Sequence, residues 1–407
     1  MVDALYIHVP FCHAKCLYCD FDSKACRDAA AFDAYVRSMV ACIERLGASG
    51  VLASCRTAYI GGGTPSVLGK GLVEIVRAVR AMAPALTEFS CEANPESFTA
   101  DLARALAAAG ATRVSLGVQT FNGVELRALG RLHSAQDAKD AIAAARAAGL
   151  LVSIDLMCGI SLQTKESWRA TLDSAVACGV DHVSVYPLTI EDGTPLARKV
   201  ARGALDEPDE DLQAWCMKEA RRVLGEAAFA PYEVASYARD AHACAHNIAY
   251  WTGANYLGLG RSAASMLDRA AYEQLRAVLG APPVSDGASR IRFVQADDTL
   301  PGPDVRYEVE TLAAREAAAE DLMLSMRMTC GAGEELIVAA ERALGQECVQ
   351  RAIDCAITQG LATWVPEESI WVPRSVPLRG KRRLVPTEQG WLLGNELFGL
   401  FWDCAGC

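Results

Sequence analysis

Short apolar stretches alternate with longer amphipathic stretches along the chain up to about residue 230. The apolar stretches are rich in Val, Ile, Leu or Ser and predict strands at Leu5–Val9, Thr57–Ile60, Glu88–Glu92, Arg113–Val118, Val152–Met157 and His182–Pro187. The Ala-rich stretches between them have helical periodicity and predict helices at Ala31–Leu46, Val67–Met82, Ala100–Ala109, Ser134–Ala148 and Lys165–Cys178. Six β/α repeats predict parallel strands with right-handed helical crossovers. Six repeats are too few for the usual eight-stranded barrel, so we expect an α/β fold, a partial (β/α)6 barrel.

The pattern changes in the second half of the chain. An amphipathic helix is predicted at Leu205–Gly225, and residues 277–306 are rich in Gly, Pro, Asp and Ser, which is typical of a linker. The last hundred residues predict helices at 308–328, 332–345 and 347–359, strands at Ala362–Val365 and Ile370–Val372, and a closing helix at Thr387–Trp402. We therefore expect a partial-barrel core over 1–235, a middle segment with a linker over 236–306, and a winged-helix-like α+β domain over 307–407.

Two features of the last domain are expected to be peripheral. The locally basic stretch RSVPLRGKRRLVP predicts a solvated loop. Cys404 and Cys407 form a C-x-x-C pair, for which a frayed tail is the simpler interpretation than a redox or metal site.

Composition narrows the classes of protein. Hydrophobic residues make up 52% and charged residues 22%, which indicates a globular protein. Lys and Arg total 39 against 50 Asp and Glu, and this acidic balance argues against nucleic-acid binding. No run of uncharged apolar residues is long enough to predict a membrane span. The N-terminal MVDALYI has no basic region before its apolar stretch, so no signal peptide is expected and a cytoplasmic location is predicted.

Three cysteines lie in one loop directly after the first predicted strand. Cys12, Cys16 and Cys19 have the spacing C-x3-C-x2-C, and Pro10 ends the strand before them. Three thiolates can hold three corners of a four-iron cluster and leave the fourth iron open to another ligand. A structural zinc site needs four ligands, and no second pair with suitable spacing follows. A disulfide framework is not expected in a large chain without a secretory signal. Three unrelated buried thiols remain an alternative, because the chain has 16 cysteines.

Polar residues and glycines follow several of the predicted strands. The segment GGGTP (61–65) follows the second strand, where consecutive glycines let backbone N–H groups approach a ligand, although a tight turn would use the same residues. Glu92 ends the third strand and is either a ligand carboxylate or a solvated side chain before a turn. Gln119, Arg131 and Asp155 lie at or after the next strand ends. An arginine there can pair with a ligand carboxylate or cap a helix end.

These motifs together resemble a known family. C-x3-C-x2-C after a first strand resembles the signature of radical S-adenosylmethionine (SAM) proteins, in which SAM chelates the open iron. YIHVPFC with CLYCDF resembles the branch that contains oxygen-independent coproporphyrinogen III oxidase (HemN) and the heme chaperone HemW. The resemblance implies a [4Fe-4S] cluster on Cys12, Cys16 and Cys19. It also implies SAM contacts at Tyr6, Gly62 and Glu92, and a second SAM at Tyr18, Gly63, Thr64, Gln119, Arg131 and Asp155. The family usually continues with Gly-Leu-Pro after Asp155, where this chain has Gly159-Ile160-Ser161.

The segment HNIAYW (246–251) matches the HNxxYW motif of the HemW branch, in which the histidine is implicated in heme binding. An imidazole beside two aromatic rings can ligate heme iron while the rings cover the macrocycle. Taken without the family, a packing corner with His246 bonded to backbone is the simpler interpretation. The branch usually continues Cys-Gly-Ala-His after LGLG, whereas this chain has RSAA (261–264), so Ala264 replaces a second candidate histidine.

The resemblance implies a heme chaperone of the HemW type that binds a [4Fe-4S] cluster, SAM and heme and passes heme to an acceptor protein. The alternatives are coproporphyrinogen III oxidase and another radical SAM enzyme acting on a tetrapyrrole. The oxidase usually has a fourth cysteine where this chain has Phe21, and a long extension before the cluster loop, whereas Cys12 is only eleven residues from the start. Oxidase activity is therefore not expected, and any other enzymatic activity stays open. The C-terminal domain resembles the HemN type and predicts a lid or partner-docking role, and a transient contact with a membrane-protein acceptor is compatible with this hypothesis.

Overall fold

The centre of the fold is a large, open, curved sheet. The computed structural model describes residues 1–239, 242–298, 300–302, 304–373, 376 and 380–406. Twelve strands follow the order β14-β13-β12-β11-β1-β4-β5-β6-β7-β8-β10-β9. Six of them are parallel and lie in chain order: β1 (Ala4–Val9), β4 (Thr57–Gly62), β5 (Glu88–Ala93), β6 (Arg113–Gln119), β7 (Leu151–Cys158) and β8 (His182–Pro187). The sheet does not close on itself, because β14 and β9 are its two edge strands. The predicted partial barrel is therefore confirmed.

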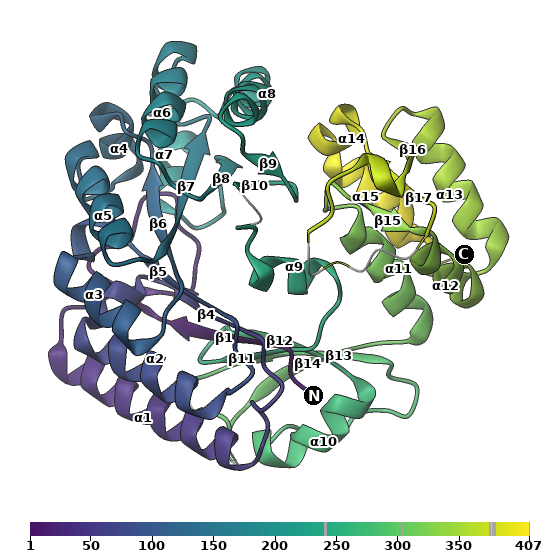
Figure 1. Cartoon of the computed structure of the whole chain (residues 1–407), viewed down its shortest axis with the longest axis horizontal. Coiled ribbons are helices and arrows are strands. Elements are labelled where there is room, and N and C mark those ends of the chain that lie inside the picture. The colour runs from purple at the N-terminus through teal and green to yellow at the C-terminus, as the bar shows by residue number, and fades with distance from the viewer. Residues whose placement is uncertain (240–241, 299, 303, 374–375, 377–379, 407) are drawn as a thin grey trace.

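Helices connect these strands and cover the outer face of the sheet (Figure 1). They are α1 (Ala29–Ala48), α2 (Lys70–Met82), α3 (Ala100–Ala109), α4 (Gly123–Leu129), α5 (Ala135–Ala147), α6 (Lys165–Ala177), α7 (Pro195–Ala201) and α8 (Glu210–Glu226). Their starts follow local rules: Ser134 and Asp137 form a reciprocal capping box before α5. Asp209 caps α8, which therefore begins five residues later than Leu205, the predicted start. The main apolar core lies between these helices and the sheet.

The sheet extends beyond the six repeats, and two expectations from the sequence are wrong. β11 (Tyr256–Leu259) lies parallel to β1, and antiparallel strands continue from it: β12 (Ala264–Asp268), β13 (Arg290–Gln295) and β14 (Tyr307–Leu312). At the other edge are β10 (Ser236–Ala238) and β9 (Ala230–Pro231). Thus 277–306 is not simply a linker, because β13 lies inside it, and 308–328 is not one helix, because β14 precedes α11 (Ala314–Ser325). The predicted boundaries at 235 and 306 stay predictions.

The C-terminal part packs around a second apolar core, beside the sheet domain in Figure 1. It contains α11, α12 (Glu334–Leu344), α13 (Gln346–Thr358), α14 (Glu388–Leu392), α15 (Gly394–Trp402) and a sheet ordered β15 (Ala332–Gly333), β17 (Arg382–Pro386), β16 (Ala362–Pro366). Three helices with a small antiparallel sheet form the winged-helix-like arrangement expected.

Three details of this part differ from the sequence analysis. Ile370–Val372 is not a strand, and the partner of β16 is instead β17, which lies in the stretch expected to be a solvated loop. Cys404 is buried in the core rather than frayed, and Cys407 lies outside the described residues.

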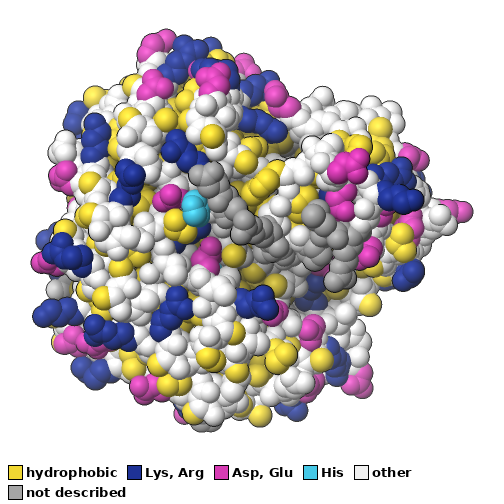
Figure 2. Space-filling model, viewed as in Figure 1, with side chains coloured by type: hydrophobic (Ala, Val, Ile, Leu, Met, Phe, Trp, Pro, Cys, Tyr) yellow, Lys and Arg dark blue, Asp and Glu magenta, His cyan; other side chains and the backbone are white. Residues whose placement is uncertain are grey.

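The surface matches an acidic globular protein. On the face shown in Figure 2, Lys and Arg side chains are interspersed with Asp and Glu. Among the helices of the described part of the chain, none combines the length and apolar character that crossing a bilayer requires.

Candidate functional site

The inner face of the curved sheet carries polar side chains, because alternate residues of each parallel strand point inward. They enclose a cavity of about 440 Å³. Strand residues that line it include Tyr59, Glu92, Arg113, Ser115, Ser153, Asp155, His182 and Ser184. Every residue in the predicted cluster, SAM and heme sets also lines it: Tyr6, Cys12, Cys16, Tyr18, Cys19, Gly62, Gly63, Thr64, Glu92, Gln119, Arg131, Asp155 and His246. The structure thus brings all of them together, while their individual roles stay predictions.

The cysteine loop is closed at its base by a short parallel pair, β2 (Phe11–Cys12) and β3 (Lys24–Ala25). Its three cysteines are free thiols that line the cavity. Thr64 Oγ1 donates to Cys12 Sγ at 3.4 Å, and Arg131 Nη1 donates to Cys16 Sγ at 3.3 Å. In the described part of the chain no three His, Cys, Asp or Glu side chains converge enough to hold a single metal ion. The ligands of a cluster lie further apart, because each binds a different iron.

Arg131 is fixed by the site and does not cap a helix. Its Nη2 donates to Asn94 Oδ1 at 2.7 Å and to the Gly117 carbonyl at 2.5 Å. Burial alone would lower its pKa, but neighbouring Tyr18 and Cys16 raise it above its ordinary value. The guanidinium therefore stays charged beside Cys16 Sγ, to which it donates a hydrogen bond.

The glycine loop packs directly on the cysteine loop. Gly63 N donates to the Val9 carbonyl at 2.8 Å, and Thr64 N donates to the Phe11 carbonyl at 2.7 Å. Gly62 has a φ of 106°, and a Cβ there would lie 2.7 Å from the His8 ring. Side chains are thus excluded at the point where the two loops meet.

Two carboxylates face the cavity from adjacent parts of the sheet. Glu92 accepts from Tyr59 O–H at 2.9 Å and from Gly62 N–H at 3.2 Å, and Asp155 accepts from Ser115 Oγ at 3.3 Å. Burial raises the pKa of Glu92 to about 7, with a further contribution from Asp155, and burial raises the pKa of Asp155 to about 6. Neither carboxylate forms a salt bridge with a described residue. Buried carboxylates without a salt bridge suit a ligand that brings an amine and hydroxyl groups.

Three further predicted residues line the same cavity: Gln119, Tyr6 and Tyr18. Gln119 is buried with φ 66° at an irregularity in β6, and such left-handed backbone at a non-glycine residue is typical of functional sites. The hydroxyl of Tyr6 lies 3.3 Å from His8 Nδ1. Burial raises the pKa of Tyr18 well above its ordinary value, so its phenol stays protonated.

His246 lies on α9 (Ala245–Trp251) and is 1% exposed. Both ring nitrogens have side-chain partners: Nδ1 lies 3.0 Å from Thr57 Oγ1, and Nε2 lies 3.2 Å from Tyr250 Oη. Burial lowers the pKa of His246 to about 3, so the imidazole is neutral at physiological pH. The simpler interpretation, in which the His246 side chain bonds to backbone, is therefore wrong, because both ring nitrogens contact side chains.

The other motif residues of the HNxxYW helix do not all face the cavity. Asn247 and Tyr250 line the cavity, but Trp251 is not among the described lining residues. Instead the Arg327 guanidinium lies 4.7 Å from the centre of its ring. The expectation that both aromatic residues cover one flat ligand is therefore wrong for Trp251. Ala264 is exposed at the start of β12 and is not among the described residues of the cavity wall.

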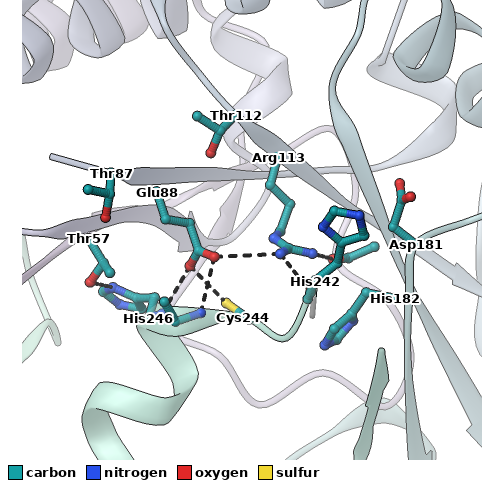
Figure 3. Close-up of polar contacts among 12 residues, drawn as sticks. Thr57, Thr87, Glu88, Thr112, Arg113, Asp181, His182, His242, Cys244 and His246 are labelled. Atoms are coloured by element: carbon teal, nitrogen blue, oxygen red, sulfur yellow. Dashed lines mark hydrogen bonds and ion pairs between the residues drawn. The ribbon is translucent and has the colours of Figure 1, made fainter. Parts of the chain in front are cut away.

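Sequence reasoning missed the network that holds α9 in place (Figure 3). Glu88 Oε1 accepts from His246 N–H at 2.9 Å, and Glu88 Oε2 accepts from Ala245 N–H at 3.1 Å. Arg113 Nη2 lies 3.5 Å from Glu88 Oε2 and donates to the His242 carbonyl at 2.8 Å. The period-2 alternation of polar residues within the apolar strands is the sequence signal that could have identified Glu88, Arg113 and Tyr59.

The two departures from the family pattern have local structural roles. Arg261 Nε donates to Asp22 Oδ2 at 2.7 Å, and Ser262 Oγ donates to the same oxygen, which fastens the end of the cysteine loop to the turn after β11. The Gly159-Ile160-Ser161 turn is closed by Gln163, whose Oε1 accepts from Gly159 N–H at 2.7 Å.

Comparisons with known proteins agree with this geometry. The model of the radical SAM superfamily matches residues 6–175. The heme chaperone HemW of Mycobacterium tuberculosis is 35% identical over 345 residues, which cover 83% of this chain and 85% of that protein. The mitochondrial radical S-adenosyl methionine domain-containing protein 1 of Bos taurus is 40% identical over 272 residues, which are 64% of this chain and only 60% of that protein. The structure of coproporphyrinogen III oxidase (HemN) from Escherichia coli, at 19% identity, superposes with a TM-score of 0.74 over 98% of this chain and 90% of HemN, and so shares the fold.

Proposed function

This chain belongs to the radical SAM superfamily and, within it, to the HemW family, and on that premise we propose that it is a heme chaperone. It binds a [4Fe-4S] cluster, SAM and heme, and passes the heme to an acceptor protein. The observation that carries this proposal is that one cavity is lined both by the three thiols and by a neutral imidazole, His246.

The cavity has an outer end at the cysteine loop. The residues there fit the cluster and SAM. Cys12, Cys16 and Cys19 would hold the cluster, with Arg131 donating a hydrogen bond to Cys16 Sγ. Glu92 would accept hydrogen bonds from a SAM amine or hydroxyl, as it accepts from Tyr59 O–H and Gly62 N–H. Nearby, Asp155, Gln119, Tyr18, Gly63 and Thr64 are available to a second SAM. When bound, cluster and SAM together supply one-electron chemistry.

At the inner end of the cavity, where α9 lies, His246 would ligate the iron of the heme cargo. In the tautomer whose Nδ1–H donates to Thr57, Nε2 keeps the lone pair that a metal needs, and Thr57 then fixes the orientation of the ring. Iron could bind at Nε2 only if the Tyr250 hydroxyl turned away, because this hydroxyl is hydrogen-bonded to Nε2 in the structure. Heme loading is therefore accompanied by movement of Tyr250 or of α9.

The test is anaerobic cluster reconstitution of wild type, Cys16→Ala and His246→Ala, followed by heme titration and transfer to a heme-free globin. Wild type is expected to bind about one heme and release it to the globin. Cys16→Ala should lose most iron and sulfide, whereas His246→Ala should keep them and bind heme at least tenfold more weakly. His246 contacts Thr57 and Tyr250 rather than the cysteine loop, which is why the cluster should survive.

The same samples distinguish the chaperone from the oxidase, which shares the fold. Phe21 stands where the oxidase usually has a fourth cysteine, so no conversion of coproporphyrinogen III to protoporphyrinogen IX is expected. Such conversion by wild type, or an unchanged heme titration in His246→Ala, would contradict the proposal. The acceptor is a heme-requiring protein whose identity is open, and the proposed location is the cytoplasm.

A further inference from the structure

Tyr59 lies between the two ends of the cavity and contacts both. Its hydroxyl donates to Glu92 Oε1 at 2.9 Å. Its ring stacks on the imidazole of His246, with ring centres 5.2 Å apart and planes inclined by 24°. Tyr59 points inward from β4, two residues beyond Thr57, which holds Nδ1 of the same imidazole. One rigid side chain therefore joins the carboxylate of the outer end to the imidazole of the inner end.

We propose that Tyr59 is a positioning residue that couples ligand binding at Glu92 to ligand binding at His246, an inference that rests on the proposed function. A ligand that donates hydrogen bonds to Glu92 favours its ionised form, and an ionised carboxylate holds the Tyr59 hydroxyl more strongly. A fixed Tyr59 ring in turn restricts the plane of the imidazole that stacks on it, while Thr57 holds Nδ1 of the same imidazole. Less orientational freedom is then lost when iron binds Nε2. SAM should therefore raise the affinity for heme, and heme should raise the affinity for SAM by the same factor.

The experiment measures this linkage on the full, cluster-reconstituted chain under anaerobic conditions. Heme is titrated by its Soret absorbance with and without saturating SAM, and SAM is titrated calorimetrically with and without heme. In wild type, SAM should strengthen heme binding about fivefold. In Tyr59→Phe, which keeps the ring stack and removes only the hydroxyl, this factor should fall to about one.

A matched control is Tyr256→Phe. Tyr256 continues the same row of aromatic rings, with its ring centre 4.4 Å from that of Tyr250, and forms no hydrogen bond with Glu92 in the described structure. It should keep the fivefold factor, which shows that loss of a nearby tyrosine hydroxyl is not sufficient.

Four results would overturn the inference. An equal factor in wild type and Tyr59→Phe would do so, as would binding of both ligands to wild type without linkage, and in both cases the proposed function stands. A fall in heme affinity on adding SAM would show that the ligands exclude each other sterically, again against the inference alone. Failure of wild type to bind heme at all would overturn the proposed function and this inference together.

Discussion

At the scale of single residues, two buried carboxyl groups of the cavity destabilise the ligand-free protein when they are ionised. Glu92 and Asp155 face each other's charge without a salt bridge to a described residue, and burial raises both pKa values. A carboxyl whose pKa is raised in the folded state binds more protons than in the unfolded state. The free energy of unfolding therefore falls as the pH rises from the ordinary value of the carboxyl to its raised value.

We predict that Glu92→Gln has opposite effects on stability and on SAM binding. Since the pKa of Glu92 is about 7, the ligand-free protein loses stability between about pH 4.5 and pH 7, and the uncharged variant avoids this loss. At pH 8 the variant should be more stable than wild type by about 1–3 kcal/mol, while at pH 5 the two should be similar. Denaturant midpoints at both pH values test this. An equal difference between variant and wild type at the two pH values would contradict it.

SAM affinity should change in the other direction. The amide of Glu92→Gln cannot provide two charged acceptor oxygens, so calorimetric titration should show at least tenfold weaker SAM binding. Asp155→Asn is the comparison: burial raises the pKa of Asp155 to about 6, a similar shift from its ordinary value, so a similar gain in stability at pH 8 is expected.

Candidate site residues could be predicted from the sequence where a motif identified them. The cysteine spacing and the HNxxYW segment identified Cys12, Cys16, Cys19 and His246. No motif identified Tyr59 or Glu88, because their importance comes from the register of neighbouring strands, Thr57 opposite Glu88 and Tyr59 opposite Ser90. Register is set by tertiary packing and not by local propensity.

At the scale of elements, the cysteine loop depends on a contact from a distant turn. Asp22 accepts from Ser262 and Arg261, and the Asp22 carbonyl lies 2.8 Å from His8 Nε2. The hydrogen bond from Ser262 is the main cause that lowers the pKa of Asp22, and Arg261 lowers it further. Stabilisation from a lowered carboxyl pKa is present above the ordinary pKa and is lost only as the pH falls through the folded value.

We predict that Asp22→Asn weakens the hold on the cluster without unfolding the protein. The ion pair is partly exposed, so the free energy of unfolding should change by less than about 1 kcal/mol at pH 7. The loop end should nevertheless move more freely, and a chelator should remove iron from the reconstituted variant several times faster than from wild type. Arg261→Ala should reproduce this effect. Identical rates of iron loss in all three proteins would refute the role of this contact.

α9 is a second element held from outside itself. Glu88 accepts from two of its first N–H groups and forms a buried pair with Arg113. We predict that Glu88→Ala costs about 3 kcal/mol of unfolding free energy, because it leaves Arg113 buried without a counter-ion. Glu88→Gln should cost less, because its amide oxygen still accepts from an N–H group of α9. Chemical denaturation of both variants tests this, and equal costs would show that the hydrogen bonds to α9 contribute nothing and that loss of the charge alone is the cause.

Element prediction from the sequence succeeded where periodicity was continuous and failed where turn residues interrupted it. All six parallel strands and the helices α1, α2, α3, α5, α6 and α8 were predicted, because each has an uninterrupted apolar pattern, whereas the short helices α4 and α7 were not. β13 was missed although its sequence RIRFVQ alternates, with Ile291 and Phe293 buried, because Gly, Pro and Asp on both sides suggested a linker. β14 alternates less clearly, and its single fully buried residue, Leu312, could equally begin a helix.

At the scale of the whole molecule, α9 lies between the sheet domain and the C-terminal part (Figure 1). Arg327 connects the two: its guanidinium lies 4.7 Å from the ring centre of Trp251 on α9 and 4.9 Å from that of Phe398 on α15. Burial lowers the pKa of Arg327, while buried Glu233 acts in the opposite direction. The helix that carries His246 is thus stabilised from both sides, by Glu88 within the sheet and by Arg327 beyond it.

We predict that Arg327→Met selectively loosens α9. Methionine keeps an apolar stem of similar length but loses the cation between the two rings, a contact worth about 1–2 kcal/mol when desolvated. Local opening of α9 should therefore become about tenfold more frequent, since tenfold corresponds to about 1.4 kcal/mol. Hydrogen–deuterium exchange should show faster exchange at residues 245–251, with strands β4 and β5 unchanged. Arg382→Met removes a comparable cation, 4.1 Å from the Trp364 ring centre within the C-terminal part, and should leave α9 exchange as in wild type. If exchange rose equally along the whole chain, or if both variants affected α9 alike, Arg327 would be stabilising the fold in general rather than holding the helix that presents His246.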